Sequence, residues 1–264
     1  MKKGISFFWG FRDDSPEQKI KMLSDAGFDS VMVTIEKKFE KENGSAKQQM
    51  ALFKKYGISP SSLHMRYKGW NLSNFWKKGF GGAFLEHQLK KDVKTAHKNN
   101  IPAVVVHLVG EPSLIGLKRL KRILKLCKKL DVFLAIENIN YPNLFAYVFE
   151  NIEHENLKFC YDSGHNNTFD AQTDYLEKYG DKLVCLHLHD NRGSHDDHTL
   201  NKYGTINWKK IAEKLAKINF NGSLDYEMIM YYRTDETSQQ VLLEVFEQAK
   251  ELEQMIEDFK KEKH

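Results

Sequence analysis

Long hydrophobic runs are absent from this chain of 264 residues. The longest apolar runs, at 5–9 and at 103–107 with its flanks, fall short of the roughly 20 residues that cross a bilayer. The N-terminal MKKGISFFWGFRDD places two lysines before an apolar stretch, as a signal peptide does, but the stretch is too short and no small-residue cleavage site follows. We therefore expect a cytoplasmic protein that makes no contact with membranes, and we interpret the apolar stretch as the first strand.

Cysteine is scarce as well. The three cysteines, Cys127, Cys160 and Cys185, cannot all pair, and none belongs to a C-x-x-C motif. Without an export signal, reduced thiols in a cytosol are the simplest interpretation. A disulfide-stabilised secreted fold is therefore not expected.

The chain also lacks a strong excess of positive or negative charge. The 40 Lys and Arg residues are nearly balanced by 36 Asp and Glu, so the net charge is only +4. The lysines lie mainly on expected helices and in the C-terminal FKKEKH, which indicates a solvated surface of mixed sign. Basicity this mild does not predict a nucleic-acid partner.

Short β-rich runs alternate with longer amphipathic segments along the whole chain, which predicts a parallel sheet. Strands are expected at 5–9, 30–35, 61–65, 103–107, 132–137, 158–161, 183–187 and 223–227, and helices near 16–26, 45–56, 83–99, 114–130, 144–152, 173–179, 207–218 and 237–261. Eight units without a linker favour one closed barrel over an open sheet, and no G-x-G-x-x-G follows the first strand. We predict an α/β fold, a single-domain (β/α)8 TIM barrel over 1–264.

Residues of the kinds that bind metal ions stand at the ends of six consecutive expected strands. They are His64, His107, Glu137, Asp162 with His165, His187 and Glu227. Alone, a histidine at such a place is usually a rim residue and a carboxylate usually caps the next helix. Because these ends meet in one mouth of a parallel barrel, unpaired carboxylates would repel one another there. A bound divalent cation (Zn, Mn, Co or Fe) relieves this repulsion, and we predict such a metal site.

Two short spacings extend the predicted site. Asp162-x-x-His165 turns through a glycine, and Asp196-x-His198 places two ligands on one side of an extended segment. The run around Asp196 is also compatible with a solvated loop. His187 and His189 have the same strand parity, so both can point inward. We assign His187 as the deeper ligand and His189 to the substrate or to the support of a ligand.

The loop after the third strand, RYKGWNLSNFWKKGFGG, interleaves cations with aromatic residues. Arg66 and Trp70 are candidates to hold the anionic group and the ring of a sugar. The same residues could grip a nucleic-acid strand or pack the loop onto the barrel rim. Trp9 and Glu36, at the ends of the first two strands, are further candidates for lining the site, on position alone.

These motifs resemble the xylose isomerase-like TIM-barrel superfamily, which includes sugar phosphate isomerases/epimerases and the related endonuclease IV. The resemblance covers nearly the whole chain and is most specific in FCYDSGHNNTFDAQTDYLEKYGDKLVCLHLHD, AIENIN and DYEM. It implies a shared metal held by Glu137, Asp162, His187 and Glu227. In members related to endonuclease IV a larger set holds three zinc ions. The matching additional positions are His64, His107, His165, Asp196 and His198, so one to three ions are expected.

Three functions follow from the resemblance. The first is a metal-dependent isomerase or epimerase of a sugar or sugar phosphate, in which Glu137 and Glu227 are the catalytic acid/base pair around a metal-stabilised enediolate and His165 binds the substrate. The second is an endonuclease IV-like zinc phosphodiesterase that cleaves abasic DNA. Ser163 and Gly164, where the repair enzymes carry Thr and Cys, disfavour it, so nucleic acid is not the expected partner. The third is a non-catalytic binding protein on the same barrel. Oligomeric state stays open, with a homo-oligomer among the alternatives.

Overall fold

The computed structural model of the chain describes residues 1–6, 14–228 and 236–262. Trp9, which the sequence places near the site, lies outside these residues. The first strand begins earlier than predicted, at Lys2, and spans Lys2–Ser6, so the expected range 5–9 overlaps it only at its end.

Eight parallel strands form the barrel, as the sequence predicts. They are β1 (Lys2–Ser6), β2 (Ser30–Thr34), β3 (Ser59–His64), β4 (Ala103–Val106), β5 (Phe133–Glu137), β6 (Leu157–Asp162), β7 (Leu183–His187) and β8 (Ser223–Tyr226). They are ordered β7-β6-β5-β4-β3-β2-β1-β8. Leu188, just after β7, closes the ring: its N–H donates to the Asp225 carbonyl (2.8 Å) and its carbonyl accepts from the Glu227 N–H (2.9 Å).

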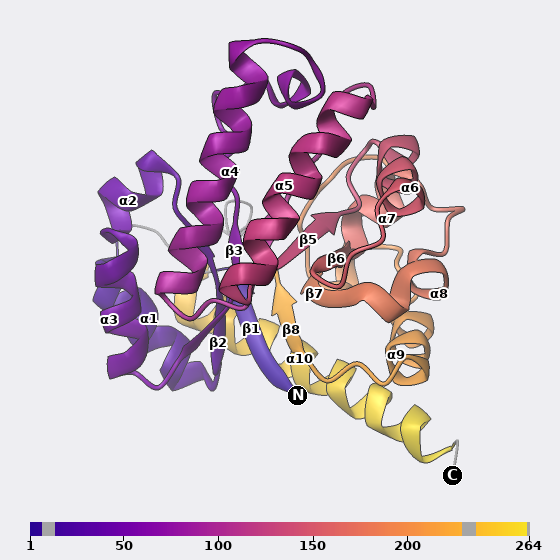
Figure 1. Cartoon of the computed structure of the whole chain (residues 1–264). Coiled ribbons are helices and arrows are strands. Elements are labelled where there is room, and N and C mark those ends of the chain that lie inside the picture. Colours follow the sequence, from indigo (N-terminus) through magenta and orange to yellow (C-terminus); the bar gives the residue numbers. More distant parts are fainter. Residues whose placement is uncertain (7–13, 229–235, 263–264) are drawn as a thin grey trace.

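Helices surround the barrel, and Figure 1 shows α4 and α5 side by side over one part of it. The α-helices are α1 (Pro16–Ala26), α2 (Lys37–Asn43), α3 (Ala46–Lys55), α4 (Phe80–Lys98), α5 (Leu114–Leu130), α6 (Pro142–Asn151), α7 (Ser163–Phe169), α8 (Tyr175–Tyr179), α9 (Trp208–Lys217) and α10 (Ser238–Lys261). Short 3-10 helices are η1 (Leu72–Trp76), η2 (Gly180–Lys182) and η3 (Asn201–Tyr203). None of the helices in the described ranges is both long and apolar enough to span a membrane.

Each predicted helix is present within a few residues, but α2 and α7 were not predicted. Neither has an apolar stripe of helical period: α2 reads KKFEKEN and α7 reads SGHNNTF. Helix α7 begins because the Asp162 carboxylate caps it, accepting from the His165 N–H at 2.6 Å. Helix α1 begins with a capping box between Ser15 at the N-cap and Gln18 in the first turn, and Pro16 occupies its first position.

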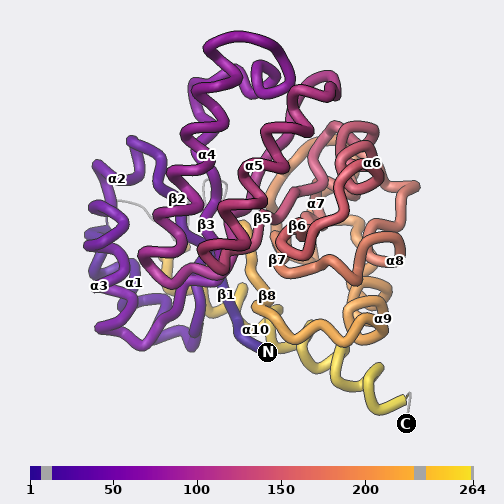
Figure 2. The backbone as a smooth tube through the Cα atoms, in the orientation of Figure 1, coloured from indigo at the N-terminus to yellow at the C-terminus, as the bar shows by residue number. Residues whose placement is uncertain are grey.

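Strand register decides which polar residues share a level at the C-terminal mouth. Asp162 pairs in register with His187, and His64 pairs with Thr34. Figure 2 shows the chain's N-terminal end beside α10 at the opposite end of the barrel, where the Met1 amino group pairs with Glu253. The polar strand ends are therefore gathered at one mouth, as expected of a parallel barrel.

Candidate metal centre

Glu137, the last residue of β5, lies at the centre of the polar cluster. Its Oε1 lies 3.0 Å from Nδ1 of His165, and its Oε2 lies 3.1 Å from both Nε2 of His107 and Nδ1 of His187. The side chain is 1% exposed. A single buried carboxylate thus contacts imidazoles from three different strand ends.

The histidines after β3 and β4 form one side of the cluster. Nε2 of His64 lies 3.2 Å from Nε2 of His107, and Nδ1 of His64 lies 2.9 Å from the Met65 carbonyl. Burial and the neighbouring His107 lower the pKa of His64 to about 3. His64 is therefore neutral, the form in which imidazole binds a metal ion.

Asp162 connects β6 to the histidines that follow it. Its Oδ2 lies 3.5 Å from Nδ1 of His165, and its Oδ1 lies 3.0 Å from Nε2 of His189. Gly164 permits this approach, because a Cβ there would lie 1.9 Å from Cε1 of His189. The glycine that the sequence showed between Asp162 and His165 is thus needed for close packing.

The loop between β7 and α9 brings Asp196 and His198 to the mouth. His198 has a positive φ of 48°, its Nε2 lies 3.1 Å from Oδ2 of Asp196, and its Nδ1 lies 2.9 Å from the Glu227 carbonyl. Asp196 also reaches Nε2 of His165 at 3.3 Å. The interpretation of this run as a solvated loop is therefore wrong for His198, which is buried, whereas the Asp196 side chain is 30% exposed.

Within the described residues, several buried polar atoms of the cluster have no hydrogen-bond partner. They are Nδ1 of His165, Nδ1 of His187, Nδ1 of His189 and Oδ1 of Asp196. Nδ1 of His187 lies 3.1 Å from Oε2 of Glu137 but lacks hydrogen-bond geometry toward it, so the nitrogen lone pair can face a third atom. Nitrogen and oxygen lone pairs arranged in this way suit a divalent cation.

Among the described residues, five groups bring three ligand atoms within 4.8 Å of one another. They are His64–His107–Glu137, Glu137–Asp162–His165, Asp162–His187–Glu227, His189–Asp196–His198 and Glu137–Cys160–His187. The structure thus brings together all nine residues that the sequence predicted as metal ligands. It adds His189 and Cys160, which were not predicted as ligands. The cluster fits one or more divalent ions.

The charged groups of the cluster shift one another's pKa values. Burial alone would raise the pKa of the Glu137 carboxyl, but His107 and His187 outweigh burial and hold this pKa well below its usual range. Burial would lower the pKa of His187, yet Glu227 and Glu137 raise it to about 10. Glu137 is therefore ionised, and the proton on His187 supplies compensating positive charge that a metal ion would replace.

A cavity of about 140 Å³ opens above the cluster. It is lined by Thr34, Phe39, His64, Tyr67, His107, Glu137, His165, Asp196, His198 and Glu227. Tyr67 belongs to the loop whose interleaved cations and aromatic residues were expected to stack on a sugar ring, and its ring centroid lies 5.2 Å from those of both His64 and His107. Thr34 and Phe39 are the lining residues that the sequence did not single out.

The residues that the sequence predicted to bind substrate differ in their positions relative to the cavity. His189 is buried beneath the cluster and stacks on His198, with ring centroids 3.8 Å apart. Glu36 accepts hydrogen bonds from the backbone N–H groups of Tyr67 and Lys68, so it holds the loop after β3.

Arg66 and Trp70 make their contacts with α4. Nε of Arg66 lies 3.4 Å from Oδ1 of Asp92, and the ring of Trp70 meets that of Phe84 edge to face. Neither is among the described residues that line the 140 Å³ cavity. Of the alternatives for this loop, these contacts favour packing onto the barrel rim, and a substrate role for either residue stays a prediction.

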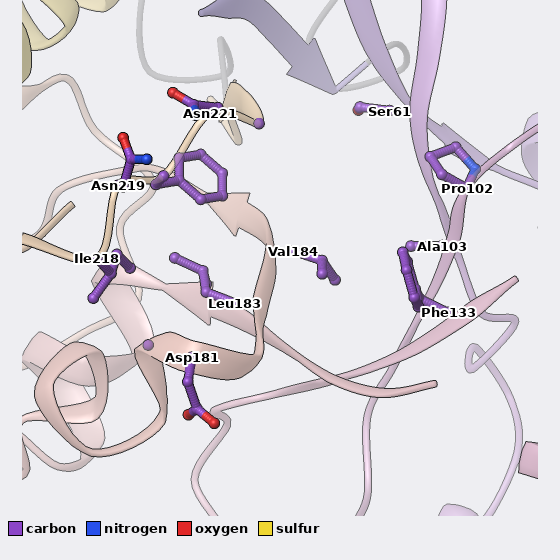
Figure 3. A pocket seen from close by; sticks show the side chains of 13 residues that line it. Ser61, Pro102, Ala103, Phe133, Asp181, Leu183, Val184, Ile218, Asn219 and Asn221 are labelled. Carbon is purple, nitrogen blue, oxygen red and sulfur yellow. The ribbon is translucent and has the colours of Figure 1, made fainter. Parts of the chain in front are cut away.

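A larger cavity, of about 420 Å³, lies at the opposite mouth of the barrel (Figure 3). Its walls include Ala103, Phe133 and Val184 near the starts of β4, β5 and β7, and the segment 218–222. The residues that line it include none of the candidate metal ligands. Of these two cavities, only the one at the C-terminal mouth is lined by candidate metal ligands.

The chain is similar in sequence to several curated proteins. MJ1311, an uncharacterized protein of Methanocaldococcus jannaschii, is 24% identical over 249 residues, which cover 86% of this chain and 83% of that protein. Shorter matches, over 39% of this chain, cover 36% and 42% of two other curated relatives.

Solved structures share the fold. A D-tagatose 3-epimerase-like protein superimposes with a TM-score of 0.78 at 20% identity, covering 98% of this chain and 99% of that one. The IolI protein with a bound zinc atom gives 0.75 at 15% identity, covering 98% and 99%. The family model of the xylose isomerase-like TIM barrel matches residues 20–251, and the chain belongs to this family.

Proposed function

We propose that the protein is a metal-dependent isomerase or epimerase that acts on a sugar or a sugar phosphate. The observation that carries the proposal is the position of Glu137. This one carboxylate lies within 3.1 Å of His107, His165 and His187, at the base of a cavity that Glu227 also lines. It can therefore both hold an ion and face a substrate bound above it.

In the proposed reaction, the ion stabilises negative charge and the two glutamates transfer protons. A divalent ion, when bound, polarises neighbouring substrate oxygens and stabilises the negative charge that develops on them. Glu137 lines the cavity, so its carboxylate is placed to accept a proton from carbon or oxygen of a substrate bound there. Glu227 follows β8 and approaches the same His187 at 3.4 Å, so it can return a proton from another side of the cavity.

The surroundings support proton transfer rather than hydrolysis by bulk water. Glu137, Asp162 and His187 are each at most 2% exposed, so water has little access to them. The fold neighbours, which include structures described as L-ribulose 3-epimerase and D-psicose 3-epimerase, support a sugar substrate by fold alone.

The test combines metal analysis with proton exchange. We expect the purified protein to contain a transition metal and to exchange a carbon-bound proton of one sugar or sugar phosphate with deuterium from solvent. Glu137→Gln should abolish the exchange. The control Glu86→Gln alters a glutamate that pairs with Arg122 on the outer helices and should leave the exchange unchanged. No exchange across a panel of both substrate classes would contradict the proposal.

A second function is supported by the additional groups His64–His107–Glu137 and His189–Asp196–His198. Clustered ions of this kind can activate water and stabilise a leaving oxyanion, as a phosphodiesterase requires. Nicking of duplex DNA with an abasic site by zinc-loaded protein, abolished by a chelator, would establish this function instead.

A further inference from the structure

The barrel interior contains a buried cluster of mostly small side chains that includes two thiols. This cluster consists of Ala103, Val105, Ala135, Cys160 and Cys185, all at most 3% exposed. Barrel interiors are usually filled by bulky branched residues. The small residues leave the sulfur of Cys160 adjacent to the metal cluster rather than separated from it.

Register places this sulfur under two ligands. Cys160 of β6 pairs with Glu137 of β5 on one side and with Cys185 of β7 on the other. Sγ of Cys160, a Glu137 carboxylate oxygen and a His187 ring nitrogen all lie within 4.8 Å of one another. No such group among the described residues includes Cys185.

A second observation indicates a missing partner at this point. Nδ1 of His187 is buried and makes no hydrogen bond to any part of the chain that the structure describes, and the residue is only 1% exposed. Its nearest carboxylate oxygen, Oε2 of Glu137, is 3.1 Å away without hydrogen-bond geometry. One nitrogen, one oxygen and one sulfur thus surround a position that a cation could occupy after small side-chain shifts.

We propose that Cys160 is a thiolate ligand of the ion that Glu137 and His187 hold. The inference rests on the metal-binding part of the proposed function. When the ion binds, it replaces the S–H proton, which passes to the solvent buffer, and a thiolate–metal bond forms. A ligand set of one sulfur, one nitrogen and one oxygen selects zinc or cobalt over manganese or magnesium.

The alternative is that Cys160 is only a small apolar residue of the core, which is common for buried cysteine. Cys185 provides the matched comparison, because it belongs to the same buried cluster, is at most 3% exposed as Cys160 is, and is in register with Cys160. A purely structural role predicts that serine at either position has the same effect on metal binding. The thiolate role predicts that only Cys160→Ser changes it.

The experiment loads the full chain, stripped of metal by a chelator, with Co²⁺ and records the near-ultraviolet absorption. We expect a sulfur-to-cobalt charge-transfer band in the unaltered protein and in Cys185→Ser, and no band in Cys160→Ser. Zn²⁺ affinity of Cys160→Ser should fall by at least the roughly 10–100-fold known for the loss of groups that support metal ligands, with Mn²⁺ affinity little changed.

X-ray absorption of the unaltered zinc-loaded protein tests the same point without a variant, since a thiolate adds a sulfur neighbour at about 2.3 Å. Bound cobalt or zinc without a sulfur signal, or a band lost in Cys185→Ser and kept in Cys160→Ser, would overturn the inference. Failure to bind either metal would refute both the inference and the metal-dependent function. A sulfur signal without turnover of any sugar would refute the proposed reaction alone.

Discussion

The carboxylate of Asp190 accepts a hydrogen bond from the indole N–H of Trp208 at 2.7 Å, across the base of the loop that carries Asp196 and His198. The same carboxylate accepts from the backbone N–H groups of Asn191, Thr205 and Ile206. One buried side chain therefore ties together both ends of a loop that has little regular structure of its own.

Removing this anchor should loosen the loop while the barrel stays folded. We expect Asp190→Ala to lower the free energy of unfolding by about 2–4 kcal/mol, because four donors lose a buried acceptor. Metal bound through Asp196 and His198 should be lost as well. Thermal unfolding and metal analysis measure the two effects. Asp181→Asn, at an exposed carboxylate, is the control, and equal behaviour of the two variants would show that Asp190 is not an anchor.

Loss of Glu137 should remove more metal than loss of His198. Glu137 belongs to three of the five candidate groups in the described residues, and His198 belongs to one. We expect Glu137→Gln to bind fewer ions per chain than His198→Ala, as measured by elemental analysis after dialysis. If both variants lose the same amount, the protein holds a single ion, or the two residues depend on one another for binding.

Gly164→Ala should be destabilising although glycine lies within helix α7. Alanine usually stabilises a helix interior by about 1 kcal/mol relative to glycine. Here the added Cβ would lie 1.9 Å from Cε1 of His189, so we expect a loss of about 1–3 kcal/mol from overpacking, together with weaker metal binding.

Gly81→Ala in α4 is the comparison for this variant, because its Cβ would meet only the flexible side chain of Asn74 at 3.0 Å. Urea unfolding of both variants gives the free energies. A Gly164→Ala protein at least as stable as the parent, with its metal retained, would show that His189 moves aside without cost.

Asp92 should make stability depend on pH. Burial raises the pKa of this carboxyl from about 3.8 to about 6, although Arg66 opposes the shift. The folded state therefore binds the proton more tightly than the unfolded state, and stability falls as pH rises from about 4 to about 6.

The shift corresponds to about 3 kcal/mol, and Asp92→Asn removes this contribution. We expect the difference in unfolding free energy between parent and variant to change by up to that amount between pH 4 and pH 7. Chemical denaturation at several pH values measures the difference. A difference that is constant over this range would mean that Asp92 keeps an ordinary pKa.

Local sequence determined the strand–helix alternation and, through it, the mouth at which polar residues gather. Periodicity and helix caps are set by near neighbours, and the ends of parallel strands share one edge by topology. His64, His107, Glu137, Asp162 and Glu227 could therefore be assigned to one site. Helices α2 and α7 escaped prediction because neither has an apolar stripe; α7 is capped by the Asp162 carboxylate, and α2 has no side-chain cap hydrogen bond.

Only the tertiary structure decided which of these side chains lies at the centre of the site and which of them contact one another. Strand register and side-chain rotamers place Glu137 at the centre, put His189 among the potential ligands and bring the sulfur of Cys160 beneath them. They also direct Arg66 toward Asp92 on α4. Such distances depend on barrel stagger and on irregularities such as the register shift between Phe159 and Cys160, which no local pattern encodes.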